Sequence, residues 1–135
     1  MLPKNQSFVS GRIASIKYAF IGFKKLATTE HSIISQLIGL FIVSCAGFYF
    51  KISATEWMIQ TLAFFLVLSI EGLNTAVEKI ADFIHPEFHK KIGEIKDIAA
   101  GAVTFAALGT LIILTIIYLP KFNIYIKKRI PIGFG

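Results

Sequence analysis

The stretch Trp57–Ile70, WMIQTLAFFLVLSI, runs directly into Glu71–Glu78, EGLNTAVE, and together these two segments decide the fold. The first segment has fourteen uncharged residues, whereas a helix that spans a bilayer needs about 20. A spanning helix here therefore carries Glu71 to the edge of the hydrocarbon. A carboxylate at that depth costs about 2 kcal/mol or more, so we interpret Glu71 first as a functional residue.

Two further uncharged stretches flank this segment. Residues 32–50 are uncharged over nineteen positions and residues 98–119 over twenty-two, and the mean hydropathy of the chain is +0.69. Apolar segments of this length indicate transmembrane helices. We therefore predict one all-α integral membrane domain over residues 1–120. Its three spans are expected at about 31–50, 56–79 and 97–119.

The segment before the first span, residues 7–28, is predicted to form an amphipathic helix that lies on the membrane surface. Its apolar residues recur at three- and four-residue steps and so share one helix face, whereas lysines lie to the sides: Ile13, Ile16, Phe20 and Phe23 make up that face. The alternative is a polar leader that continues directly into the first span.

Four residues mark the expected ends of the other helices. Thr55 is a candidate N-cap for the second spanning helix. His85-Pro86 predicts a break after that helix, because the residue before a proline disfavours helical backbone. Asp97 is expected to open the third helix and Pro120 to close it, which leaves residues 121–135 as a basic tail.

The net charge of +6 is unevenly distributed along the chain. Five basic residues precede residue 31 and four lie in the 79–97 region, whereas the hairpin between the first two spans has only Lys51. Positive residues favour the cytoplasmic side, so the N-terminus and the 79–97 loop are predicted inside and the C-terminus outside. The basic tail argues against this arrangement. Because the cations flank apolar spans, lipid headgroups rather than nucleic acid are the expected partner.

Three polar residues of the second span have helical spacing. At about 100° per residue, Asn74 lies roughly 60° and Glu78 roughly 20° from Glu71, so the three share one face. Lys96-Asp97 returns at the same membrane face on the next helix, and Glu30 lies at the cytoplasmic end of the first. Carboxylates beside a lysine are suited to Mg²⁺ and phosphate.

Other interpretations of these residues are simpler. Glu78 with Lys79 fits an ordinary interfacial ion pair, and Lys96 fits a lysine that extends toward the headgroups. His85 and His89 have the spacing of a zinc site, but Pro86 between them breaks the helix that such a site would need.

Three motifs in order, Glu71–Glu78, then Glu87-Phe88-His89, then Lys96–Val103 (KDIAAGAV), resemble the small prokaryotic diacylglycerol kinase family, which includes undecaprenol kinases. The E-x-x-N-x-x-x-E and K-D motifs at this separation are specific, and the resemblance covers about residues 8–119. It implies a homotrimer of three-helix protomers whose active sites are shared between neighbouring subunits.

The resemblance also implies roles for single residues. Glu71 resembles the catalytic base that takes the proton from the lipid hydroxyl, with Asn74 beside it at the substrate. Glu30 and Glu78 resemble the Mg²⁺-binding acids. The nucleotide-binding set that the resemblance implies is Tyr18, Glu30, Asn74, Glu78, Lys96 and Asp97.

We therefore expect a Mg²⁺-dependent lipid kinase of the bacterial inner membrane, which transfers the γ-phosphoryl group of ATP to a lipid alcohol. Undecaprenol is favoured over diacylglycerol, because the Lys96–Val103 segment looks closer to the undecaprenol kinase branch. The alternative is a small membrane transporter or accessory subunit, since intramembrane acids also occur in proton-coupled transport.

Overall fold

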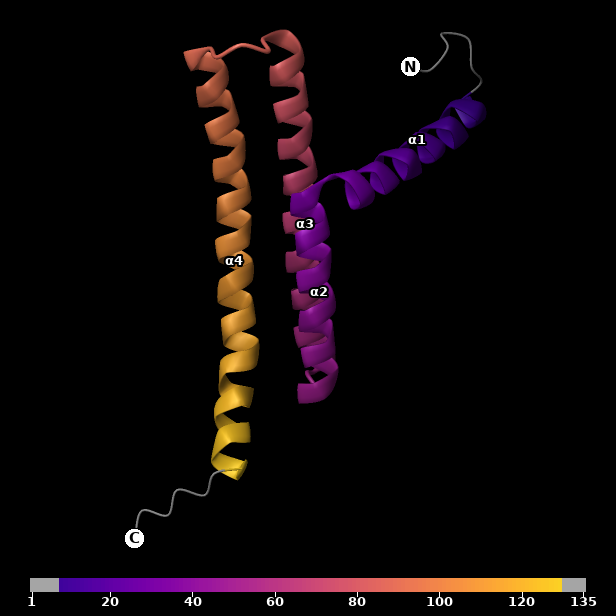
Figure 1. Ribbon diagram of the computed structural model, residues 1–135. Coiled ribbons are helices and arrows are strands. Elements are labelled where there is room, and N and C mark those ends of the chain that lie inside the picture. Colours follow the sequence, from indigo (N-terminus) through magenta and orange to yellow (C-terminus); the bar gives the residue numbers. More distant parts are fainter. Residues whose placement is uncertain (1–7, 130–135) are drawn as a thin grey trace.

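The computed structural model describes residues 8–129, and four helices account for nearly all of these residues (Figure 1). They are α1 (Phe8–Thr29), α2 (His31–Phe50), α3 (Ala54–Ile84) and α4 (Lys90–Arg129). The predicted all-α class is confirmed. The helices α2, α3 and α4 are each long and apolar enough to cross a membrane, as the sequence predicted.

The helix α1 diverges from the other three, which run side by side (Figure 1). The helices α1 and α2 are joined at Glu30. The backbone of this residue is extended, with φ −97° and ψ 111°, and it interrupts the helical path before α2 begins. A helix therefore exists where the surface helix was expected, and it leaves the bundle at one end of α2. Its position in the headgroup layer remains a prediction.

A short turn joins α2 to α3 and makes them antiparallel. Lys51 ends α2 in the left-handed conformation with φ 52°, and the N–H of Ile52 bonds back to the carbonyl of Gly47 at 3.1 Å. Ser53 then caps α3, because its backbone N–H donates to Glu56 Oε2 at 2.6 Å and its Oγ accepts from the Glu56 N–H at 3.3 Å. The prediction that Thr55 is the cap is wrong; the reciprocal pair selects Ser53.

Close packing beside this turn depends on one glycine. A Cβ on Gly47 would lie 2.8 Å from the indole of Trp57, a distance that real Cβ atoms do not tolerate. The Trp57 ring also packs on Phe48, with 4.9 Å between ring centroids. The glycine thus lets α2 and α3 approach closely at this end of the bundle.

A buried polar cluster connects α2, α3 and α4. Gln60 of α3 is fully buried, and its Oε1 accepts a hydrogen bond from the Tyr118 hydroxyl at 2.7 Å. The same hydroxyl lies 3.0 Å from the Val43 carbonyl oxygen. Thr110 adds a 3.4 Å bond to the Ala63 carbonyl. Because few groups in an apolar bundle can replace these partners, the contacts fix the relative positions of the helices.

The helix α4 is longer at both ends than the sequence predicted. It begins at Lys90 rather than at Asp97. In its first turn the Gly93 N–H donates to the His89 carbonyl at 3.0 Å. It also continues through Pro120 to Arg129. A proline removes one N–H from a helix but does not always end it, and α4 has compensating contacts beyond this residue. One of these is the ion pair between Lys121 and Glu56 at 3.0 Å.

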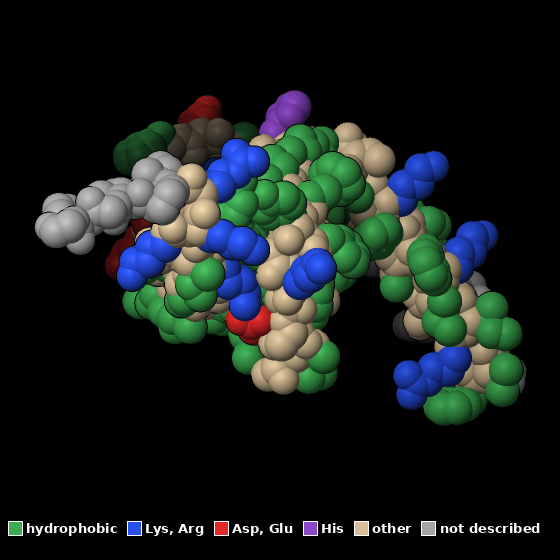
Figure 2. Space-filling view, turned by 90° about the horizontal axis from the view of Figure 1, so that it is seen from below, with side chains coloured by type: hydrophobic (Ala, Val, Ile, Leu, Met, Phe, Trp, Pro, Cys, Tyr) green, Lys and Arg blue, Asp and Glu red, His purple; other side chains and the backbone are tan. Residues whose placement is uncertain are grey.

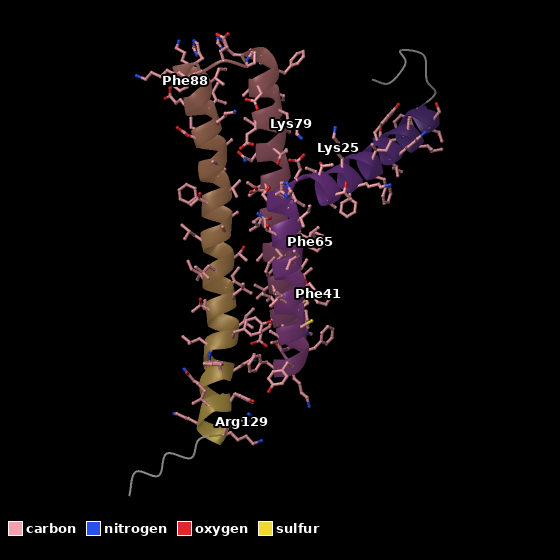
Figure 3. The ribbon with its side chains drawn as sticks, in the orientation of Figure 1. Lys25, Phe41, Phe65, Lys79, Phe88 and Arg129 are labelled. Atoms are coloured by element: carbon pink, nitrogen blue, oxygen red, sulfur yellow. The ribbon has the colours of Figure 1, made fainter. Side chains whose placement is uncertain are left out.

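Many large apolar side chains point outward from the helices, among them Phe41 and Phe65 (Figure 3). Phe41 is 70% exposed and Phe105 is 80% exposed. Apolar surface of this extent fits a protein that is covered by lipid or by further subunits.

Candidate active site at one end of the bundle

The polar face of α3 brings three predicted residues together. Glu71 and Asn74 are both buried, and Asn74 Nδ2 donates a hydrogen bond to Glu78 Oε1 at 2.9 Å. Because the two residues are four apart on one helix, this bond holds the side chains parallel to the helix axis. Glu71 lies about 10 Å from Glu78 along that axis, so the two carboxylates can act on different atoms of one substrate complex.

Two acceptor groups on this face have no hydrogen-bond partner within residues 8–129. Asn74 Oδ1 is buried without a hydrogen bond, and the Glu71 carboxylate makes none with any other part of residues 8–129. A buried acceptor without a partner costs free energy, and an ion, a water molecule or a ligand can supply the missing partner. The arrangement thus offers free acceptors to an incoming hydroxyl or cation.

Lys96 approaches this face of α3 from the neighbouring helix α4. Its Nζ lies 2.6 Å from Asp82 Oδ1, and it also lies within electrostatic range of Glu78. Asp97, its neighbour, is exposed, and its side chain forms no ion pair within the described part of the chain. The structure thus brings the lysine of the K-D motif, rather than its aspartate, to the α3 carboxylates.

Asp82 was not among the residues expected at the site. It lies four residues after Glu78, which places it about 20° from Glu71 on the same helix face. Extending the face by one more turn would have identified it from the sequence. The ion pair between Asp82 and Lys96 holds the lysine beside the polar face of α3.

Glu30, between α1 and α2, is paired with a lysine of α3. Lys79 Nζ is 2.6 Å from Glu30 Oε1, and the Thr29 hydroxyl donates to the same oxygen at 3.1 Å. The hydrogen bond from Lys79 lowers the pKa of the Glu30 carboxyl, against a smaller opposing effect of burial. Lys79 therefore pairs with Glu30 rather than with its neighbour Glu78, which is bonded to Asn74.

A cavity of about 240 Å³ lies at this junction between α1 and α3. Figure 3 shows Lys25 and Lys79 on either side of the junction. Gly72 of α3 allows α1 to approach closely here, because a Cβ at this position would lie 3.1 Å from Leu26. Two lysines beside a carboxylate make an opening that suits an anion with an attached cation. The remaining lining residues are Gly22, Glu30, Thr75 and Ala76.

Tyr18 is not brought to this face within one protomer. It lies in α1, eight residues before Leu26, and 51% of it is exposed. No hydrogen bond or ring contact joins it to α3 in the region the structure describes. A contact between Tyr18 and a nucleotide at the α3 face would need a second subunit.

A metal ion would find suitable but incomplete ligands in a single chain. Within residues 8–129, no cluster of three His, Cys, Asp or Glu side chains could hold a metal alone. The His85 and His89 rings lie 5.0 Å apart without a third ligand. The free Asn74 Oδ1 and the Glu78 carboxylate are nevertheless the hard oxygen donors that Mg²⁺ prefers, so the residues fit that ion.

These features define a small multi-pass membrane protein with a carboxylate-rich site at one end of its helix bundle. Residues 17–118 match the family described as prokaryotic diacylglycerol kinase. The chain belongs to this family, as the motifs predicted, and it is a lipid kinase of the undecaprenol and diacylglycerol kinase type with ATP as co-substrate.

Curated relatives carry both names. The chain is 36% identical over 107 residues to an undecaprenol kinase of Bacillus subtilis (strain 168), covering 79% of this chain and 87% of that one. It is 29% identical over 110 residues to a diacylglycerol kinase of Synechocystis, covering 80% and 62%. With a diacylglycerol kinase of Escherichia coli (strain K12) it shares 23% over 100 residues, covering 74% and 82%.

Proposed function

We propose that this chain transfers the γ-phosphoryl group of Mg²⁺–ATP to the hydroxyl of undecaprenol, with Glu71 as the general base. The observation that carries the proposal is the buried Glu71 carboxylate, which has no hydrogen-bond partner in residues 8–129 and shares a face with the Asn74–Glu78 pair. A general base at the depth of the headgroups can reach the lipid hydroxyl, because that hydroxyl lies at the same depth.

The proposed step uses the chain's own groups as follows. Glu71 accepts the proton of the lipid hydroxyl, and the oxygen of that hydroxyl forms a bond to the γ-phosphorus of ATP. The bond between that phosphorus and the β,γ-bridging oxygen breaks, and ADP leaves with the electron pair. Asn74 orients the substrate beside the base, and Lys96 provides positive charge where negative charge develops.

We assign Mg²⁺ to Glu78 and Glu30, with Asn74 Oδ1 as a further candidate donor. When bound, the ion would neutralise charge on the nucleotide phosphates. Glu30 is already paired with Lys79 at 2.6 Å, so binding a metal there requires Lys79 to release it. The two lysines of the α1–α3 cavity, Lys25 and Lys79, are then free to contact phosphate oxygens.

Undecaprenol is proposed over diacylglycerol on two grounds. The identity to the Bacillus subtilis undecaprenol kinase is 36% over 107 residues, against 35% over 80 residues to a diacylglycerol kinase of Helicobacter pylori and 23% over 100 residues to that of Escherichia coli. The small residues 99–102 of α4 also leave space, because a Cβ on Gly101 would meet no atom within 4 Å. A thin polyprenyl chain fits such a surface, although a subunit contact would fit it as well.

We further propose a homotrimer with the N-terminus in the cytoplasm and the C-terminus outside. The remote position of Tyr18 supports a site shared between subunits, and so does the extensive exposed apolar surface. The charge distribution supports the orientation, since Lys51 is the only cation of the α2–α3 turn. Reporter fusions at Lys51 and Gly135 should both read outside; a cytoplasmic signal at Lys51 would overturn the orientation.

The central test compares lipid alcohols with radiolabelled ATP in matched mixed micelles. We expect kcat/KM to be higher for undecaprenol than for diacylglycerol, and kcat to be about 10²- to 10⁴-fold lower for Glu71→Gln than for the wild type. A clear preference for diacylglycerol would reverse the substrate assignment and leave the kinase intact. Absence of any lipid phosphorylation by the wild-type chain would instead favour the transporter alternative.

A further inference from the structure

The last turns of α4 form a structured extension at the end of the bundle farthest from Glu71. The matched family region ends at residue 118, but α4 continues to Arg129. The helix has 40 residues, about 60 Å at 1.5 Å each, whereas a bilayer's hydrocarbon core is about 30 Å thick. In Figure 1 the end of α4 projects beyond the turn between α2 and α3.

Contacts with α2 and α3 hold this extension in place. Lys121 pairs with Glu56 at 3.0 Å. The Tyr125 ring packs edge-on against Tyr49 and Phe50, with 6.0 and 6.3 Å between ring centroids. The Arg129 guanidinium lies over the Tyr125 ring at 5.5 Å. The extension is thus docked on the bundle, and its cations have defined positions.

An open groove of about 430 Å³ lies between the extension and the end of α2. Its lining is mostly apolar and aromatic and includes three lysines, of which Lys121 and Lys128 belong to α4 and Lys51 to the turn after α2. Within residues 8–129, Lys51 and Lys128 have no carboxylate partner, and Glu56 already pairs with Lys121. The groove is lined by Tyr49, Phe50, Lys51, Lys121, Ile124, Tyr125 and Lys128.

We propose that this groove binds the phosphate-bearing headgroup of an anionic phospholipid from the surrounding bilayer. The unpaired ammonium groups of Lys51 and Lys128 match the phosphate charge, and tyrosine rings characteristically lie at headgroup depth. The lipid's acyl chains would lie along exposed apolar residues such as Phe122. Figure 2 shows Lys and Arg side chains gathered beside apolar surface at this end of the bundle.

This site is separate from the candidate active site. Glu56 lies fifteen residues before Glu71 on α3, which is about 22 Å along the helix axis. The groove therefore lies at the opposite membrane face and takes its ligand from the opposite leaflet. A phospholipid bound there is neither the substrate nor the product of the kinase reaction, whichever lipid alcohol the kinase phosphorylates.

Native mass spectrometry of the full-length protein, released from vesicles with equal phosphatidylglycerol and phosphatidylcholine, tests the proposal. The wild-type chain should retain phosphatidylglycerol preferentially. The double variant Lys51→Asn/Lys128→Gln should lower the ratio of the two retained lipids by at least about fivefold, because two headgroup contacts are lost. Asparagine is chosen at position 51 because it tolerates the left-handed backbone found there.

A matched control removes the same charge from the other end of α4. Lys90→Gln/Lys91→Gln should retain the wild-type ratio, and an equal loss in that variant would overturn the proposal in favour of a general charge effect. Retention of the preference by Lys51→Asn/Lys128→Gln would overturn it directly, as would displacement of the lipid by millimolar inorganic phosphate. Kinase activity should be unchanged in both variants and reports folding. Should the double variant misfold, Lys128→Gln alone, in the exposed last turn, carries the test.

Discussion

Two buried polar side chains on α3, Gln60 and Asn74, form hydrogen bonds of different kinds. Gln60 accepts a bond from Tyr118 of α4, whose hydroxyl also reaches α2. Within residues 8–129, the side chain of Asn74 bonds only to Glu78, one turn further along its own helix. Each side chain keeps one buried polar atom without a partner in the part of the chain that the structure describes: Gln60 Nε2 and Asn74 Oδ1.

The difference indicates how one helix separates structure from chemistry. Polar groups that bond across helices hold the bundle together, because replacing them disturbs more than one element. Polar groups that bond along one helix leave the neighbouring surfaces free, and Glu71 beside them has no hydrogen-bond partner within residues 8–129. We therefore expect substitutions near Gln60 to change stability and substitutions near Glu71 to change catalysis.

The largest expected effect comes from Glu71→Gln. Removing a general base should lower kcat by about 10²- to 10⁴-fold, while the thermal midpoint and the oligomer size stay unchanged. Initial rates with saturating ATP and lipid measure it, and Glu94→Gln, which alters an exposed acid of α4, is the control. A Glu71→Gln protein that keeps most of its turnover would eliminate the general-base role.

Glu78→Gln should raise the Mg²⁺ concentration needed for half-maximal rate by about tenfold or more, because an anionic oxygen donor is lost. The amide can still accept the bond from Asn74, so folding should be preserved. A Mg²⁺ titration of the initial rate gives the result, and binding of Mn²⁺ followed by electron paramagnetic resonance gives a second readout. An unchanged titration would remove Glu78 from the metal site.

Tyr118→Phe should act on stability alone. It removes the hydroxyl that joins Gln60 to the Val43 carbonyl, and hydrogen bonds of this kind contribute about 0.6 kcal/mol, rarely more than about 1.7 kcal/mol. Reversible unfolding in mixed micelles measures the loss, which should shrink in a Gln60→Leu background. If Tyr118→Phe instead lowers kcat and leaves stability unchanged, the part of α3 around Gln60 is not purely structural.

The smallest effect concerns the ion pair between Lys79 and Glu30. Because the pKa of Glu30 is lowered, the pair stabilises the fold above the carboxyl's unfolded pKa of about 4.3, and this contribution disappears as the pH falls through the lower folded value. Lys79→Met should therefore lower the thermal midpoint slightly at pH 7 and by less at pH 3. An equal difference at both pH values would show that the lysine acts through packing.

The fold could be largely predicted from the sequence because long apolar stretches have few alternatives to spanning helices. The shared face of Glu71, Asn74 and Glu78 followed from helical geometry alone. What could not be predicted depends on contacts between distant residues. Pro120 stops a helix in most settings, and its tolerance here accompanies the contacts of Lys121 and Tyr125. The pairing of Lys79 with Glu30 depends on where α1 leaves the bundle.

The close approach of Gly47 to Trp57 has a consequence for biosynthesis. The two residues are ten positions apart, and only residues 51–53 separate the helices that carry them. Closing so short a loop costs little entropy, so α2 and α3 can pair as soon as both have left the ribosome and entered the bilayer. The nascent chain thus gains a preformed helical hairpin against which α4, synthesised last, can dock.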